Sequence, residues 1–232
     1  MVCQNRSDCN AGQIARSKEY FPALSNAGRT LTWVDMVALY PAPQECLAAF
    51  LVTSAAEVLA GVKPANLIRI GKRELPCGRC MFRLWQEHGR ELLSGATLQA
   101  LALREEADGV LLLLYRPELL EARLRGRTMK AFLTQRGYPR PLTLDGILAR
   151  LQDDYRKGGS PDEVGVFLGY PLKDVKGFMN RGKNIWQGRC LWRVYGPPSR
   201  SLRLYRSFCR EREAVTQKLA AGWLPNQLLG AV

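Results

Sequence analysis

The chain has 232 residues, of which 47% are hydrophobic and 24% are charged, a globular composition that excludes disorder of the whole chain and allows a sizeable core. Its 34 lysine and arginine residues against 21 aspartate and glutamate residues give a formal net charge of +13. This excess favours phosphates, nucleic acid or acidic partners but does not choose among them, since arginine also supplies ordinary solvated helix faces.

The N-terminal residues and the cysteines predict a cytoplasmic protein. No apolar stretch follows the first basic residue, Arg6, as it would in a secretory signal. The most apolar window, Cys46–Ala56, has eleven residues, whereas a helix that spans a bilayer needs about 20. The seven cysteines are scattered and odd in number, unlike the dense framework of a small secreted domain. We therefore expect reduced thiols and no membrane insertion.

Residue composition divides the chain into two parts. Residues 1–33 are polar, rich in Ser, Asn and Gly, and without a sustained hydrophobic period, which predicts a loosely ordered N-terminal extension. Residues 34–232 are too few for two full domains and a linker, so we expect them to form a single α+β domain.

Hydrophobic periodicity predicts the elements of this domain in chain order. Helices are expected at 44–60, 81–88, 117–136, 144–156, 161–168 and 171–181, and the remainder to the C-terminus is expected to be helical apart from one strand. Strands are expected at 65–70, 98–104, 109–116 and 191–195. The second and third strands form a hairpin, and the continuous apolar run Val110–Tyr115 indicates a central strand covered on both faces. The predicted fold class is α+β, a small mostly antiparallel sheet covered by helices, with a helical C-terminal half.

Residues 160–182 contain clear start and stop signals for two helices. Ser160 and Glu163 have the spacing of a capping box, with Pro161 at the first helical position. Gly169 is suited to end that helix in a left-handed conformation, and Pro171 is suited to start the next one. The sequence therefore predicts two short helices that meet across a tight turn.

The same segment, 161–181, has the pattern of a helix-turn-helix, whose second helix would read DNA. The residues expected to face DNA are Lys173, Lys176, Asn180 and Arg181. Against this interpretation, Asp174 would repel phosphate, Gly177 weakens a helix, and helical hairpins are common in ordinary cores. DNA binding is therefore an alternative function.

The pair Cys77 and Cys80 is spaced as in redox and metal sites. It follows a predicted strand and precedes a helix, whose N-terminus would lower the pKa of a thiol. No cis-proline or βαβ unit of a thioredoxin-like fold is evident, and zinc would need ligands from distant segments. Thiol redox chemistry or metal binding at these cysteines is a second alternative, and buried structural thiols are a third.

Arginines recur every three or four residues near the C-terminus, at Arg200, Arg203, Arg206 and Arg210. Leu202, Tyr205 and Phe208 recur beside them, so one helix presents a cationic stripe next to an apolar stripe. The stripe could contact an anion, or its aliphatic stems could cover the edge of the core.

Five stretches follow one another in an order typical of a known family. They are Leu59–Leu67, Tyr115–Leu120, Phe132–Leu133 with Gly137–Tyr138, Glu163–Phe178 and Trp192–Gly196. Together with Tyr205 and Cys209 they resemble the domain-of-unknown-function family 3793 of anaerobic bacteria, over about residues 45–212.

The resemblance implies a stand-alone cytoplasmic protein with a link to iron limitation and flavodoxin, and no established activity comes with it. Many members look to carry a His-Cys-Ala-Pro-Thr stretch just before a Gly-Ile-Lys motif, whereas this chain has Ser54–Val58 there. Chemistry that relied on that His and Cys is not expected here. With His88 as the only histidine and no phosphate-binding loop or dinucleotide fingerprint, the sequence predicts neither an enzyme class nor a cofactor.

Phenols, cations and carboxylates of the matched stretches are candidate ligand-binding residues. They are Lys63, Tyr115, Arg116, Tyr138, Glu163, Tyr170, Asp174 and Lys176. Aromatic residues at the ends of elements are also frequent at core rims. The function expected first is that of an accessory protein that binds an anionic small molecule or an acidic protein partner.

Overall fold

The computed structural model describes residues 33–75, 77–180 and 186–230. The helices are α2 (Trp33–Leu39), α3 (Pro43–Ser54), α4 (Ala56–Leu59), α5 (Met81–Leu93), α6 (Pro117–Leu124), α7 (Arg127–Gln135), α8 (Leu144–Arg156), α9 (Val164–Phe167), α10 (Leu172–Met179), α11 (Ser199–Ala220) and α12 (Pro225–Leu229). The strands are β1 (Ala65–Gly71), β2 (Gln99–Glu106), β3 (Gly109–Tyr115), β4 (Trp186–Arg189) and β5 (Arg193–Tyr195). The predicted α+β class is confirmed.

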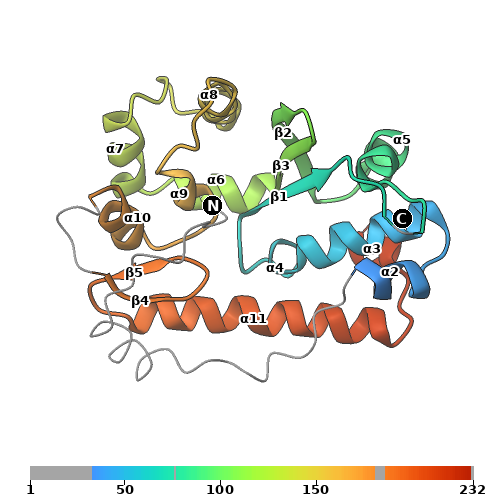
Figure 1. Ribbon diagram of the computed structural model, residues 1–232. Helices are drawn as coiled ribbons and strands as arrows, with labels where there is room; N and C mark the ends of the chain where they lie inside the picture. The colour runs from blue at the N-terminus through green and yellow to red at the C-terminus, as the bar shows by residue number, and fades with distance from the viewer. Residues whose placement is uncertain (1–32, 76, 181–185, 231–232) are drawn as a thin grey trace, which may run out of the picture.

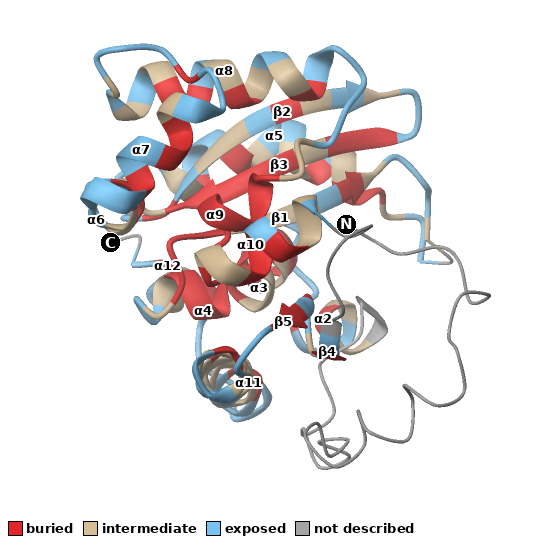
Figure 2. Cartoon of the chain, turned by 90° about the vertical axis from the view of Figure 1, so that its left-hand side faces the viewer, coloured by how far each residue is buried: buried red, intermediate tan, exposed pale blue. Residues whose placement is uncertain are grey.

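Three strands form an antiparallel sheet in the order β1-β3-β2, so β3 lies in the centre. Leu113 of β3 is opposite Leu67 on one side and Leu101 on the other. Figure 2 shows β3 coloured as buried along almost its whole length. The predicted hairpin and the predicted central strand are both confirmed.

Each face of this sheet has its own core, because successive side chains of a strand point to opposite faces. Val110, Leu112 and Leu114 pack into a cluster with side chains of α3 and α5. Leu113 and Tyr115 pack into a second cluster with side chains of α6, α7, α8 and α9. This double burial explains why β3 is continuously apolar instead of alternating between apolar and polar residues.

Local residue preferences explain where several of the helices begin. Pro43 and Pro117 each occupy the first turn of a helix, where the missing amide hydrogen has no intrahelical partner to lose. Thr143 caps α8 by accepting a hydrogen bond from the amide of Gly146 at 3.2 Å. Gln152 of α8 then donates to the carbonyl of Ala102 at 2.6 Å, which holds this helix on β2.

The long helix α11 crosses the base of the molecule beneath β4, β5, α4 and α3, as Figure 1 shows. Its C-terminal end is held by Tyr40, whose hydroxyl donates to the carbonyls of Leu219 and Trp223 at 2.9 and 2.8 Å. The helix therefore connects the first core to the β4–β5 hairpin, which lies near its N-terminal end (Figure 1).

Two local expectations are wrong. The helix expected at 117–136 is divided into α6 and α7, because the chain turns at Gly126, an extended N-cap. The capping box does not form: α9 begins only at Val164, and the Glu163 carboxylate is turned into the core towards Tyr138. The Ser160 hydroxyl instead contacts the Tyr155 hydroxyl at 3.3 Å.

The strand expected at 191–195 is also placed differently. It was expected in the main sheet, but β5 pairs with β4 in a separate two-stranded sheet. The partner strand contains Gly188 and polar residues, so it has no apolar pattern to mark it as a strand. The hairpin packs on α10 and α11 instead of on β1 or β2.

The expected N-terminal extension, residues 1–33, lies outside the described residues except for Trp33, the first residue of α2. The assignment of residues 34–232 to a single domain stays a prediction. Within the described residues, no helix is both long enough and apolar enough to cross a bilayer.

Candidate functional site

Several of the stretches that resemble family 3793 meet at one place, which we call the buried junction. It is formed by the end of α4, the turn between α9 and α10, the β4–β5 hairpin and the middle of α11. The Tyr170 ring stacks on Trp192 with 4.3 Å between centroids, and Trp192 contacts the Phe208 ring edgewise at 6.1 Å. These aromatic contacts connect the α9–α10 turn, the β4–β5 turn and α11.

Asp174 connects the same elements through hydrogen bonds, although it is only 2% exposed. Its carboxylate accepts from Trp192 Nε1 and from the amide of Tyr195, each at 2.8 Å, and from Ser201 Oγ at 2.6 Å. Lys173 Nζ pairs with the same carboxylate at 2.6 Å. A buried carboxylate with this many donors is fully compensated, so Asp174 has a structural role at the junction.

Lys63 is buried in the junction, with 2% of its surface exposed. Its Nζ donates to Asn66 Oδ1 at 2.8 Å and lies 5.7 Å from the centroid of Tyr170 and 5.1 Å from that of Phe208. Burial lowers the pKa of Lys63 to about 8, although the charge of Glu57 opposes this shift. The sequence-predicted residues Lys63, Tyr170 and Asp174 are thus brought together here.

The acid whose charge acts on Lys63 is Glu57, which is fully buried. Its carboxylate pairs with Arg212 of α11, and within the described residues its Oε2 atom has no hydrogen-bond partner. The pKa of Tyr170 is raised to about 12, mainly by burial and further by Cys190 and Glu57. Glu57 and Arg212 therefore form a partly buried ion pair beside Lys63, in which Glu57 favours and Arg212 disfavours the charge of Lys63.

A second feature, the arginine groove, lies directly outside the junction and has a volume of about 450 Å³. Its three charged residues are Arg123 of α6 and Arg200 and Arg203 of α11. The other residues that line it are Val62, Pro64, Gly169, Pro171, Leu204 and Ser207. Among the described residues, no carboxylate lines this groove.

The wall of the groove requires glycine at position 169. Gly169 has a φ of +80°, and a Cβ there would lie 2.7 Å from Cδ of Pro64. Only glycine combines this left-handed backbone with such a close approach of the α4–β1 loop. The predicted helix-ending role of Gly169 is confirmed, and the same turn closes the groove.

Arg123 is the most buried of the three arginines. Its Nη2 donates to the carbonyl of Tyr170 at 2.6 Å and its Nε to that of Val166 at 3.5 Å. Burial lowers the pKa of Arg123, and the like charge of Arg200 lowers it further. Within the described part of the chain, Arg200 and Arg203 form no ion pair. The groove therefore concentrates positive charge that no carboxylate among the described residues balances.

The other predicted site residues lie elsewhere and do not share a pocket with Lys63, Tyr170 and Asp174. Glu163 is buried beside Tyr138, whose hydroxyl donates to its carboxylate at 3.4 Å, and burial strongly raises the pKa of Tyr138. Tyr115 lines a separate cleft and donates to Gln99 at 2.8 Å. Arg116 pairs with Glu118, which is two residues further along the chain. A role of these residues in ligand binding stays a prediction.

The second helix of the proposed helix-turn-helix, α10, is turned inwards. Lys173, expected to face DNA, instead donates to the Tyr195 carbonyl and to Ser201 Oγ. A Cβ at Gly177 would overlap the ring of Tyr195, so this face of α10 lies against β5. Lys176 is exposed, with its Nζ 5.8 Å from the Phe132 centroid, and Arg181 lies outside the described residues. The expectation for Lys173 is wrong because Asp174 and Tyr195 hold it.

Cys77 and Cys80 lie at the start of α5, far along the chain from the junction. Cys77 is exposed, whereas Cys80 is buried and its thiol lies 3.3 Å from the carbonyl of Lys72. Neither forms a disulfide, and no group of three or more acidic, histidine or cysteine side chains among the described residues could hold a metal. Redox or metal chemistry at this pair stays a prediction.

Sequence reasoning missed Arg123 and the pairing of Glu57 with Arg212. Arg123 lies three residues after the buried Leu120, and this helical spacing indicates that it lies on the inward face of α6. A buried arginine is otherwise indistinguishable in sequence from the many solvated ones. Glu57 lies in Ser54–Val58, the stretch in which this chain differs from many members of the family that it resembles.

A family model described as a protein of unknown function (DUF3793) matches residues 51–229. The match includes the residues of both the buried junction and the arginine groove. No curated protein and no solved structure shows significant similarity to the chain.

Proposed function

This chain belongs to the family of proteins of unknown function DUF3793, and we propose that it binds a small anion with phosphate or carboxylate groups in the arginine groove. The observation that carries the proposal is the meeting of Arg123, Arg200 and Arg203 without a carboxylate among the described lining residues. The arginine groove is thus the site that we propose for the anionic small molecule expected from the sequence.

The proposal rests on the electrostatics of the groove. Like charges in a partly buried groove repel, and a ligand of opposite charge removes that repulsion. The planar guanidinium group matches phosphate and carboxylate oxygens in geometry and donates two parallel hydrogen bonds. A groove of about 450 Å³ is of the size that holds a small molecule.

The ordinary explanation of surface arginines is that they are solvated and cover the edge of the core. That explanation suits Arg206, which is exposed and lies outside the groove. It does not suit Arg123, which is partly desolvated next to Arg200. This difference favours a ligand at the groove over a merely solvated stripe.

Titration calorimetry of the full chain at low ionic strength, with inorganic phosphate and citrate as probes, tests the proposal. We expect Arg200→Gln and Arg203→Gln each to weaken binding by about tenfold, since each removes a charge-assisted contact. Arg206→Gln is the matched control, because it removes the same charge from the same helix outside the groove. Failure of both probes to bind, or an equal effect of all three substitutions, would contradict the proposal.

An acidic protein partner is the second candidate, because Arg200, Arg203 and Arg206 are exposed along one helix. In that case poly-glutamate would bind, citrate would not, and Arg206→Gln would weaken binding as much as the groove substitutions. A DNA duplex serves as a third probe, for which binding would weaken steeply as salt rises.

The cytoplasmic location, which the N-terminal residues and the cysteines predict, and the link to iron limitation or flavodoxin, which the family resemblance implies, belong to the same proposal. The link is supported by the resemblance alone. Protein abundance in cells of the source organism, compared with and without an iron chelator, tests the link. Unchanged abundance would remove it without affecting the groove.

A further inference from the structure

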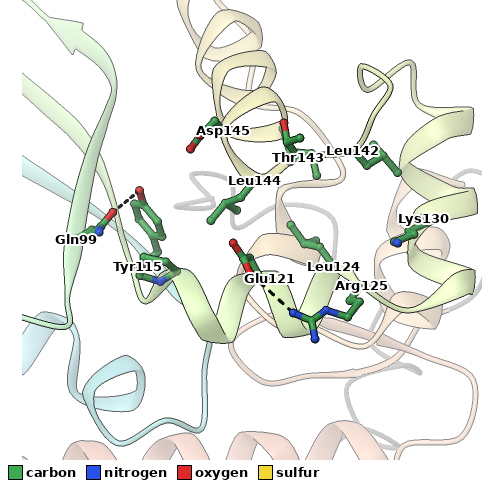
Figure 3. Close-up of a pocket in the computed structure, with 12 residues that line it drawn as sticks. Gln99, Tyr115, Glu121, Leu124, Arg125, Lys130, Leu142, Thr143, Leu144 and Asp145 are labelled. Atoms are coloured by element: carbon green, nitrogen blue, oxygen red, sulfur yellow. Dashed lines mark hydrogen bonds and ion pairs between the residues drawn. The ribbon is translucent and has the colours of Figure 1, made fainter.

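A second cavity, which we call the Tyr115 cleft, lies on the other side of α6 from the junction and has a volume of about 550 Å³. It is enclosed by the end of β3, α6, α7 and the start of α8 (Figure 3). Its charged residues are Glu121, Arg125, Lys130 and Asp145. The cleft therefore carries two charges of each sign, in a protein with a formal net charge of +13.

Asp145 and Lys130, which have opposite charges, lie on different walls of the cleft. Figure 3 shows Asp145 at the start of α8, on the side of Tyr115 and Gln99, and Lys130 on α7, away from them. The charge of Asp145 reaches Tyr115, since it contributes, after burial, to raising the pKa of that phenol. Glu121 and Arg125 lie between these ends and pair weakly at 3.9 Å.

One charge of each sign is left over in the cleft. Among the described residues, neither Asp145 nor Lys130 forms an ion pair. A simple anion would suit Lys130 but meet the carboxylate of Asp145, and a simple cation would meet the opposite conflict. A molecule with an ammonium group at one end and a carboxylate at the other would satisfy both residues.

The surface between the charged ends is apolar. It is formed by Leu124, Leu142, Leu144 and Ile147, of which Leu124 and Ile147 are buried. Such a surface suits a hydrocarbon side chain placed between two charged groups. The hydroxyl of Tyr115 and the amide of Gln99 add a hydrogen-bonding pair at the Asp145 end.

From this arrangement we propose that the Tyr115 cleft binds a short peptide with free termini, its N-terminal ammonium at Asp145 and its C-terminal carboxylate at Lys130. A free α-amino acid carries both groups on one carbon and does not extend from one wall of the cleft to the other. The proposal does not depend on anion binding in the arginine groove, because the two cavities share no lining residue.

Asp145 also has a structural explanation that the test must separate from ligand binding. It lies in the first turn of α8, where a negative charge favours the helix. Lys130 has no such explanation on α7, which lacks acidic residues in its first turn and basic residues in its last. Weaker ligand binding in both Asp145→Asn and Lys130→Gln, and not in Asp145→Asn alone, is therefore the result that indicates a ligand site.

The experiment is titration calorimetry of the full chain with the tripeptide Ala-Leu-Ala and with L-leucine. N-acetyl-Ala-Leu-Ala, which lacks the ammonium, and Ala-Leu-Ala amide, which lacks the carboxylate, are the matched half-ligands. We expect the tripeptide to bind with a dissociation constant below about 1 mM, and leucine and each half-ligand to bind at least about tenfold more weakly. Leucine that binds as tightly as the tripeptide would contradict the proposal, because its two charged groups do not lie at opposite ends.

The variants Asp145→Asn and Lys130→Gln are expected to weaken tripeptide binding by about tenfold each. Asp153→Asn in α8 and Lys157→Gln at the C-cap of α8 alter exposed residues outside the cleft, so they are the matched controls and should bind normally. Circular dichroism checks that all four variants are folded. The proposal is overturned if the tripeptide does not bind, if a half-ligand binds as well as the tripeptide, or if either cleft variant binds like the unsubstituted protein.

Discussion

The buried junction and the arginine groove are neighbours that both contain residues of α11, but they differ in whether their charged side chains form ion pairs. In the junction, Asp174 is paired with Lys173 and Glu57 with Arg212. In the groove, Arg200 and Arg203 form no ion pair with any described residue, although Arg200 lies near a second arginine. One helix thus supplies both compensated and uncompensated charges.

This difference distinguishes charges that stabilise the fold from charges that we propose bind a ligand. A charge removed from water is costly unless it is paired, so the paired charges of the junction are explained by folding alone. In the groove, Arg123 is held by the carbonyls of Tyr170 and Val166, whereas Arg200 and Arg203 form no ion pair with any described residue, and the proposed anion would account for them. Substitutions should therefore lower stability in the junction and lower anion affinity in the groove.

The largest effect is expected at Asp174. Asp174→Ala removes the common acceptor of Trp192, Tyr195 and Ser201 and leaves Lys173 without its carboxylate, so we expect a loss of about 3–5 kcal/mol in the free energy of unfolding. Urea denaturation followed by Trp fluorescence measures it. A loss below about 1 kcal/mol would show that the hairpin and α11 are held mainly by their aromatic contacts.

A smaller loss of about 2–3 kcal/mol is expected for Glu57→Gln, because Arg212 is partly exposed and regains some hydration. The double variant Glu57→Gln with Arg212→Met should be less destabilised than the sum of the two single variants. Strict additivity in this double-mutant cycle would mean that the pair does not interact.

Lys63 should make stability depend on pH. The unfolded chain holds the Lys63 proton up to about pH 10.5, whereas the folded protein releases it near pH 8. The unfolded state therefore binds more protons between these values, and stability gained from this group rises with pH. Relative to Lys63→Met, the unsubstituted protein should gain about 2 kcal/mol between roughly pH 7 and pH 10 in urea denaturation. A difference that stays constant, as expected for the exposed control Lys157→Met, would refute the buried charge.

The smallest effect on stability is expected in the groove. Arg203→Gln should change the free energy of unfolding by less than about 0.5 kcal/mol, since it breaks no ion pair among the described residues. The same variant should lose the rise in melting temperature that citrate causes in the unsubstituted protein. Thermal denaturation with and without citrate measures both. A strong destabilisation without citrate would place Arg203 with the structural charges of the junction.

Local signals in the sequence determined much of the fold. The apolar run of β3 predicted a central strand because only a doubly covered strand is apolar throughout. The periodic apolar residues of α8 predicted its bounds, and Gly169 predicted a left-handed turn, because both depend on neighbouring residues alone.

Only the tertiary structure decided how distant segments are combined. The sequence predicted a strand near β5 but not its partner strand β4. It predicted the arginine stripe of α11 but not that Arg123 of α6 lines the same groove. It also could not show that Lys173 faces Asp174 and Tyr195 instead of solvent. Local backbone preference and hydrophobic period act over a few residues, whereas burial and the pairing of charges depend on which segments pack together.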